Sequence, residues 1–290
     1  MHVTPDHKVA SGYRQTTGQR MSKVPWWAII LVVLGLFLIY EILNDTNYRA
    51  TFFYLQAGIA MTLRITLTAF PIATVIGLFM GLARMSKNQA LYTMSTIYIE
   101  VVRGIPLVVL ILMVAFALVP LGVSLVNQIG AWGLTWAAGA GLVNFFTGWV
   151  NYSIRGIPMD VRAIFALALG YGAFEAEIFR AGIQSIGKGQ MEAARSLGMN
   201  YFQCMRFIIL PQAIRRVLPP LGNDFIAMLK DSSLATVLAV NELTQLTRLR
   251  RSATFRVMEA FNVAAFLYLT MTLLLSAGVR FLERRMKVEE

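Results

Sequence analysis

The stretch "GKGQMEAARSLGMNYFQCMRFIILPQAIRR", residues 187–216, is polar and basic, although apolar segments lie on both sides of it. Its part "QMEAARSL" consists largely of good helix formers, and Gly198 follows as a residue that tolerates positive φ at a helix end. Asn200 is a candidate N-cap for a second short helix. Pro211 then opens the next apolar segment, where a missing N–H costs little. The residues predict either two short helices separated by a break or an ordinary loop with helical character.

The composition around this stretch is that of a membrane protein. Of the 290 residues, 57% are hydrophobic and 14% are charged, and the mean hydropathy is +0.61. Uncharged apolar segments of about 20 residues recur, and this length crosses about 30 Å of hydrocarbon. We therefore predict an all-α polytopic membrane protein with about six transmembrane helices. The expected spans cover residues 28–43, 55–83, 97–118, 161–183, 208–229 and 260–281.

The charge and the cysteine count exclude several other classes of protein. The formal net charge is +11, but the basic residues are dispersed between apolar segments, so nucleic-acid binding is not expected. The lone Cys204 excludes an internal disulfide and a cysteine-based metal site. Both histidines, His2 and His7, lie in the N-terminal tail. We expect no metal, no bound cofactor and no catalytic residues. The chain also lacks a P-loop and should not hydrolyse ATP itself.

Lys and Arg residues are more frequent in cytoplasmic loops, and their distribution places both termini and residues 184–216 in the cytoplasm. The basic run Arg248–Arg256 goes against this assignment. The predicted organisation is a cytoplasmic tail (1–24), an additional transmembrane helix with a short external loop (25–55), a transmembrane domain (56–285) and a C-terminal tail (286–290).

Residues 120–160 are harder to assign, because residues 131–150 carry no charge and are rich in Gly and aromatic residues. One further crossing there would put the N-terminal tail and residues 184–216 on opposite faces, although both are basic. We therefore expect an external, membrane-hugging or re-entrant insert. An extra span, or a pair of them, is the alternative.

A gap-free pattern within residues 187–216 resembles the EAA loop of bacterial ABC importer permeases. It comprises Glu192, Ala193, Ala194, Gly198, Ile208, Leu210 and Pro211. The stretches "TLRITLTAFPIATVIGLFMGLARMS" and "YIEVVRGIPLVVLIL" look like the polar amino acid subfamily, the histidine-, glutamine- and glutamate-type permeases. The resemblance covers about residues 56–285, apart from 120–160.

This resemblance implies the type I transmembrane domain of an ABC importer in a bacterial inner membrane, with residues 184–210 as the coupling loop. The loop would dock into a dimer of ATP-binding subunits, which bind ATP and Mg. The other implied partners are a second permease, identical or a sister chain, and an external amino acid binding protein. The residues expected to couple to the ATPase are Gln190, Glu192, Ala193, Ala194, Gly198, Leu210 and Pro211.

Charged residues within transmembrane segments are costly and usually face a cavity or a partner. The candidates for a substrate pathway are Glu100, Arg103, Glu175, Glu177, Asn223, Lys230, Asp231 and Ser232. Glu177 and Arg180 are three residues apart and should form an ion pair, whereas Glu175 faces elsewhere. Arg103 could instead snorkel at the interface, and Asp231 could form a local cap with the neighbouring serines.

An ion-gradient-driven secondary transporter without an ATPase partner is the alternative function. Such a protein would also contain intramembrane charges and spans interrupted by Gly and Pro. It would give no reason for the gap-free pattern from Glu192 to Pro211. The pattern therefore favours an ATP-driven importer of a polar amino acid.

Overall fold

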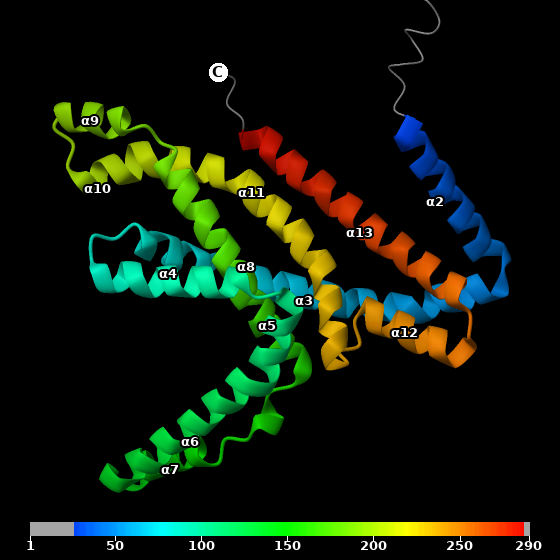
Figure 1. Ribbon diagram of the computed structural model, residues 1–290, viewed down its shortest axis with the longest axis horizontal. Coiled ribbons are helices and arrows are strands. Elements are labelled where there is room, and N and C mark those ends of the chain that lie inside the picture. The colour runs from blue at the N-terminus through cyan, green and yellow to red at the C-terminus, as the bar shows by residue number, and fades with distance from the viewer. Residues whose placement is uncertain (1–25, 287–290) are drawn as a thin grey trace, which may run out of the picture.

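The computed structural model describes residues 26–286, and this part of the chain is helical, with no β-strand in it (Figure 1). The all-α fold is confirmed. The elements are α2 (Trp26–Asn44), α3 (Thr46–Arg84), α4 (Gln89–Gly104), α5 (Leu107–Met113), the π turn η1 (Val114–Leu118), α6 (Val119–Trp136), α7 (Ala140–Val150), η2 (Ile154–Gly156), α8 (Met159–Gln184), α9 (Lys188–Ser196), α10 (Tyr201–Cys204), the π turn η3 (Met205–Ile209), α11 (Leu210–Asp231), η4 (Ser232–Leu238), α12 (Leu243–Thr254) and α13 (Val257–Met286). The predicted tails, apart from Met286, lie outside the described residues.

Three helices within residues 26–286 are long and apolar enough to cross a membrane. They are Thr46–Arg84, the continuous run Leu107–Trp136 and Val257–Arg285. Two shorter apolar helices, Ile29–Asn44 and Ala140–Val150, accompany them. Helices α8 and α11, each with five charged residues, are not among these apolar helices. The number of six crossings therefore stays a prediction.

One predicted span is wrong as a single helix, because residues 97–118 are divided between α4 and α5. The backbone is extended at Ile105 (φ −99°, ψ 133°), since the residue before a proline is disfavoured in the α region. Pro106 then precedes the first residue of α5. The break turns the chain away from α4, so α5 and α6 leave in a new direction (Figure 1).

The core of the molecule is the long contact between α3 and α8, which run in the same direction. Arg64 of α3 pairs with Asp160 of α8 at 3.2 Å, and Arg84 pairs with Glu177 further along. Between these pairs the helices approach closely, because a Cβ on Gly77 would lie 2.7 Å from the Cβ of Glu175. Small residues at such interfaces let helix backbones come together within a membrane.

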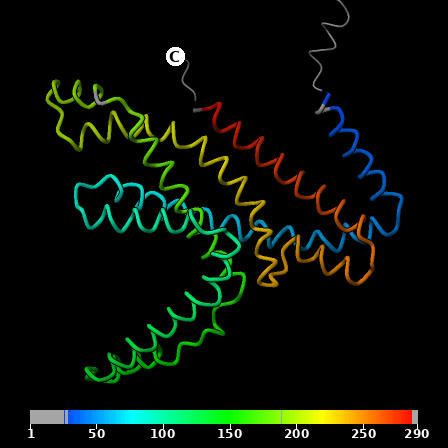
Figure 2. The backbone as a smooth tube through the Cα atoms, viewed as in Figure 1, coloured from blue at the N-terminus to red at the C-terminus, as the bar shows by residue number. Residues whose placement is uncertain are grey.

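The described ends of the chain lie on the same side of the molecule as α9 and α10 (Figures 1 and 2). Helices α11 and α13 are packed against each other with opposite directions, and a Cβ on Gly222 would meet Val279 at 2.4 Å. The last turns of α13 therefore lie beside α11, and Leu282 of α13 and Leu218 of α11 line the same pocket. The placement of both termini and residues 184–216 in the cytoplasm stays a prediction.

Each π turn ends two residues before a proline within a continuous helical run. Residues 114–118 come before Pro120, and residues 205–209 come before Pro211. In the first turn Val119 donates its N–H to the carbonyl of Val114, and Pro120 has no N–H to offer the next carbonyl, that of Ala115. Arg162 donates to this carbonyl instead, at 3.1 Å. The wider turn thus lets each helix continue through its proline.

Candidate functional site

The predicted coupling loop contains the short helix α9 and, after a break, α10, which continues through η3 into α11. Gly198 has φ +80° and ends α9, with its N–H donating to the carbonyl of Arg195 at 2.9 Å. The side chain of Asn200 accepts from the N–H of Gln203, and the Gln203 side chain accepts from the N–H of Asn200, both at 2.9 Å. This capping box confirms Asn200 as the N-cap of α10.

The loop is attached to the membrane helices by a small apolar cluster. Ile186, Ile209 and Ala213 are buried in it, and Met191 of α9 packs against them. Ala194 is also buried, whereas Glu192 and Ala193 face outward. One face of α9 therefore holds the loop in place, and the other is free for a partner.

Two large apolar side chains on this outer surface were not singled out by the sequence. Leu197 is 83% exposed and Phe202 is 70% exposed, on either side of the Gly198 turn. Exposed apolar residues close to a rigid turn are typical of a protein-binding surface. Their signal in the sequence is weak, since both lie in a segment whose helical pattern also suits an ordinary loop. The remaining predicted coupling residues, Gln190, Leu210 and Pro211, are exposed as well.

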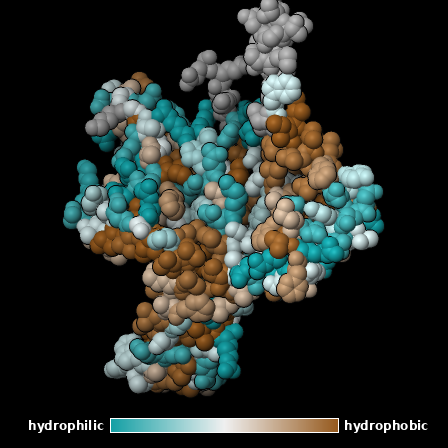
Figure 3. Space-filling model, turned by 45° about the vertical axis from the view of Figure 1, so that its right-hand side comes forward, coloured by the Kyte–Doolittle hydropathy of each residue, from teal (hydrophilic) through white to brown (hydrophobic). Residues whose placement is uncertain are grey.

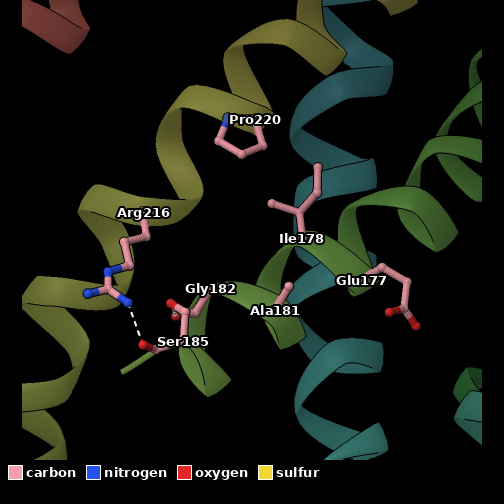
Figure 4. A pocket seen from close by; sticks show the side chains of 7 residues that line it. All are labelled: Glu177, Ile178, Ala181, Gly182, Ser185, Arg216 and Pro220. Carbon is pink, nitrogen blue, oxygen red and sulfur yellow. Dashed lines mark hydrogen bonds between the residues drawn. The ribbon is translucent and has the colours of Figure 1, made fainter. Parts of the chain in front are cut away.

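A pocket of about 430 Å³ lies directly beneath the loop, between α8 and α11 (Figure 4). Arg216 of α11 donates to the backbone carbonyl of Ser185 on its rim. Glu177 lines the opposite side of the pocket from Arg216. The pocket is thus bordered both by the start of the coupling loop and by a charged residue of the predicted substrate pathway.

Several predicted pathway residues are joined by one charge network. Arg180 donates to Glu177 at 2.6 Å, which confirms the predicted ion pair. Arg84 bridges Glu177 to Glu100, with 2.8 Å between its guanidinium and the Glu100 carboxylate. Arg103 lies over the ring of Phe174, 5.6 Å from its centroid. The network links α3, α4 and α8 at the end of the bundle nearest the coupling loop. Sequence reasoning missed the central role of Arg84, which directly follows the expected span 55–83.

Glu175 differs from Glu177 in its burial and in its lack of an ion-pair partner. It is fully buried, and within residues 26–286 neither of its carboxylate oxygens has a hydrogen-bond partner. Asp224 of α11 has one carboxylate oxygen in the same condition. A buried carboxylate without a partner is costly, and a cationic group would stabilise it. The sequence signal for Asp224, an ionisable residue within a predicted span, was present but not used.

The remaining pathway candidates are dispersed. Asp231 accepts a hydrogen bond from the Tyr171 hydroxyl on α8 at 2.8 Å and makes no local cap, so the local-cap interpretation is wrong. Ser232 is buried and donates to the carbonyl of Leu229 at 2.7 Å. Asn223 and Lys230 are exposed, and neither side chain makes a hydrogen bond or an ion pair within the described part of the chain.

Comparison with known proteins identifies the family of this chain. Residues 73–288 match the model of the "Binding-protein-dependent transport system inner membrane component" family. The glutamine transport system permease protein GlnP of Escherichia coli K12 is 35% identical over 80% of this chain and 92% of its own length. The probable glutamine ABC transporter permease protein GlnM of Bacillus subtilis is 36% identical over 79% of this chain and 92% of its own length.

A solved structure described as an amino acid ABC transporter with histidines is also similar. It has a TM-score of 0.64 and 36% sequence identity, and the match covers 84% of this chain and 98% of that one. The class is therefore the inner membrane component of a binding-protein-dependent transport system. Within that class the chain belongs to the amino acid ABC transporter permeases. This membership favours the ABC importer over the secondary transporter.

Proposed function

We propose that the chain is the membrane subunit through which an ATP-driven importer moves a polar amino acid into a bacterial cell. A separate ATP-binding subunit, carrying ATP and Mg, docks on the α9–α10 loop, and an external binding protein delivers the amino acid. A second permease, either a copy of this chain or a sister chain, completes the pathway. The family and the amino acid transport functions of its relatives support this proposal.

The observation that carries the proposal is the geometry of the loop. Its inner face is anchored by Ile186 and Ile209, and its outer face presents Leu197 and Phe202 around a turn fixed by Gly198. A rigid, anchored protrusion can transmit the closure of a bound partner as a rigid-body movement. Glu177 of the charge network and Ser185 at the start of the loop line the same pocket between α8 and α11. Helix α8 therefore carries a pathway residue and leads directly into the loop.

Reconstitution tests the proposal directly. We expect proteoliposomes that contain this chain, its ATP-binding subunit and the binding protein to accumulate a polar amino acid only when ATP is present on the side of the ATP-binding subunit. A panel of amino acids then identifies the substrate. Accumulation driven by an ion gradient without ATP, at a comparable rate, would overturn the proposal in favour of the secondary transporter.

Glu175 is proposed as the pathway residue that contacts the amino group of the substrate. Hydrogen bonds to charged groups contribute about 1.5–3 kcal/mol, so Glu175→Gln should reduce uptake by roughly tenfold or more. The ATP-binding subunit should still co-purify, because α9 and α10 are untouched. Glu41→Gln is the control, since Glu41 lies on α2, outside the predicted pathway and outside residues 73–288 that match the family. Unchanged uptake in Glu175→Gln would remove Glu175 from the pathway.

A further inference from the structure

The α6–α7 hairpin is the largest feature that the proposed function does not use. It extends away from the rest of the molecule, across the direction of α11 and α13 (Figures 1 and 2). Its base is held by a buried arginine, because Arg162 donates to the carbonyls of Ala115, Ile157 and Ile154 at 3.1, 2.9 and 3.0 Å. Ala115 lies before α6, and Ile154 and Ile157 lie after α7. The direction of the hairpin is therefore fixed by the core.

No charged residue occurs between Arg103 and Arg155, a range that includes the whole hairpin. A projecting hairpin surrounded by water would be expected to carry charges, since soluble domains are about 25% charged. The two helices also pack tightly, and a Cβ on Gly130 would lie 2.8 Å from the Cβ of Trp149. The hairpin is thus a well-packed element whose outer surface lacks the charges that water favours.

One face of the continuous α5–α6 helix is an exposed apolar stripe. On α5 and η1 it comprises Val109, Leu112 and Phe116. On α6, where we define the hairpin stripe, its residues are between 48% and 75% exposed. These are Leu121, Leu125, Ile129, Trp132 and Trp136.

The π turn keeps these two parts of the stripe on the same face. From Phe116 to Leu121 the chain advances five residues, and in a regular α-helix such a step would displace the side chain by about 140° around the axis. The turn Val114–Leu118 takes up the additional residue. The apolar surface therefore continues on one face from α5 into the hairpin, and Figure 3 shows apolar surface extending from the body into the projecting part.

The flank of α6 beside the stripe is polar but uncharged, with Ser124, Gln128 and Thr135 exposed. Trp132 and Trp136 stand at the far end of the stripe. Trp is enriched where a membrane meets water, and a helix with one apolar and one polar face lies in that interface.

We infer that the hairpin stripe is a lipid-binding surface and that the α6–α7 hairpin lies in the interfacial region of the bilayer. The stripe faces acyl chains, and the flank with Gln128 faces headgroups and water. The inference is independent of the transported substrate. We place the hairpin at the outer leaflet, and only this placement rests on the proposed orientation of the coupling loop.

Spin labels on the full-length chain in liposomes test this surface. In a Cys204→Ser background, single cysteines replace Ile129 on the stripe and Gln128 on the flank, which are neighbours on the same helix. Collision with oxygen, which partitions into lipid, is compared with collision with a water-soluble nickel chelate. We expect oxygen to dominate at position 129 and the chelate to dominate at position 128. Dominance of the chelate at both positions would overturn the inference.

The same labels distinguish lipid from a protein partner. If adding the external binding protein, or raising the protein-to-lipid ratio, shields position 129 from both reagents, the stripe is a protein interface and the inference is wrong. A second measurement avoids cysteine substitution altogether. With Trp26, Trp27 and Trp149 replaced by Phe, lipids brominated near the headgroup should quench the remaining tryptophan fluorescence more strongly than lipids brominated near the chain ends. An absence of quenching by either lipid would equally overturn the inference.

Discussion

The coupling loop and the α6–α7 hairpin are both pairs of helices that project from the membrane helices, yet their chemistry is opposite. The loop contains Lys188, Glu192, Arg195 and Arg206, whereas the hairpin contains no charged residue. Each projection turns at a glycine with positive φ, Gly198 in the loop and Gly139 in the hairpin, but only the hairpin has a continuous stripe of large apolar side chains along one helix.

The difference shows how the kind of partner determines what a projection must contain. A protein partner that transmits force requires a fixed turn, a defined outline and charges of particular sign. A lipid partner is fluid and requires only apolar surface that stays on one face. The loop should therefore be sensitive to changes of backbone geometry at single positions, and the hairpin should tolerate them as long as its packing is kept.

The largest expected effect comes from the turn of the coupling loop. Gly198→Val places a β-branched residue at φ +80°, where a side chain costs about 1–2 kcal/mol, and the turn should change shape. We expect the ATP-binding subunit to be lost on purification and uptake to fall at least tenfold. Gly198→Asn should retain much more activity, because Asn adopts positive φ more readily.

Gly189→Ala provides the matched control in the same loop. Gly189 lies within α9, and no atom lies within 4 Å of a Cβ placed there. Its replacement should leave uptake unchanged and strengthen the helix slightly. If Gly198→Val retains both the ATP-binding subunit and full uptake, the loop does not act through a fixed turn and the contrast with the hairpin is lost.

The turn and the helix cap in the predicted coupling loop could be predicted from the sequence because their signals are local. Gly198 and Asn200 determine the turn and the cap within a few residues of themselves. The all-α fold and the approximate helix positions follow likewise from apolar segments of sufficient length. The break at Pro106 also had a local signal, because "RGIP" (residues 103–106) interrupts helical regularity, although the expected span 97–118 ran across it.

Contacts between distant parts of the chain could not be predicted in the same way. The direction of the hairpin depends on Arg162 bonding to Ala115, and the place of Asp231 depends on Tyr171. Arg84 joins Glu100 to Glu177 across three helices. Each of these pairings requires the packing of α3, α4, α5, α8 or α11, which no spacing along the chain reveals.

A smaller effect is expected from the packing of the hairpin. In Gly130→Ala the new methyl group would lie 2.8 Å from the Cβ of Trp149 and 2.9 Å from the backbone nitrogen of Val150. The helices must then separate, and overpacking of this kind costs about 1–3 kcal/mol. We expect a lower melting temperature in detergent with uptake retained, because the stripe still faces lipid when α7 shifts.

Gly122→Ala is the control in the same helix, since no atom lies within 4 Å of a Cβ at that position, and it should melt no lower than the unmodified chain. The two measurements separate stability from transport, which is what the comparison of the two projections requires. Loss of uptake in Gly130→Ala at an unchanged melting temperature would contradict the comparison. The hairpin would then be sensitive to geometry in the manner expected of the coupling loop, and its role would include transport itself.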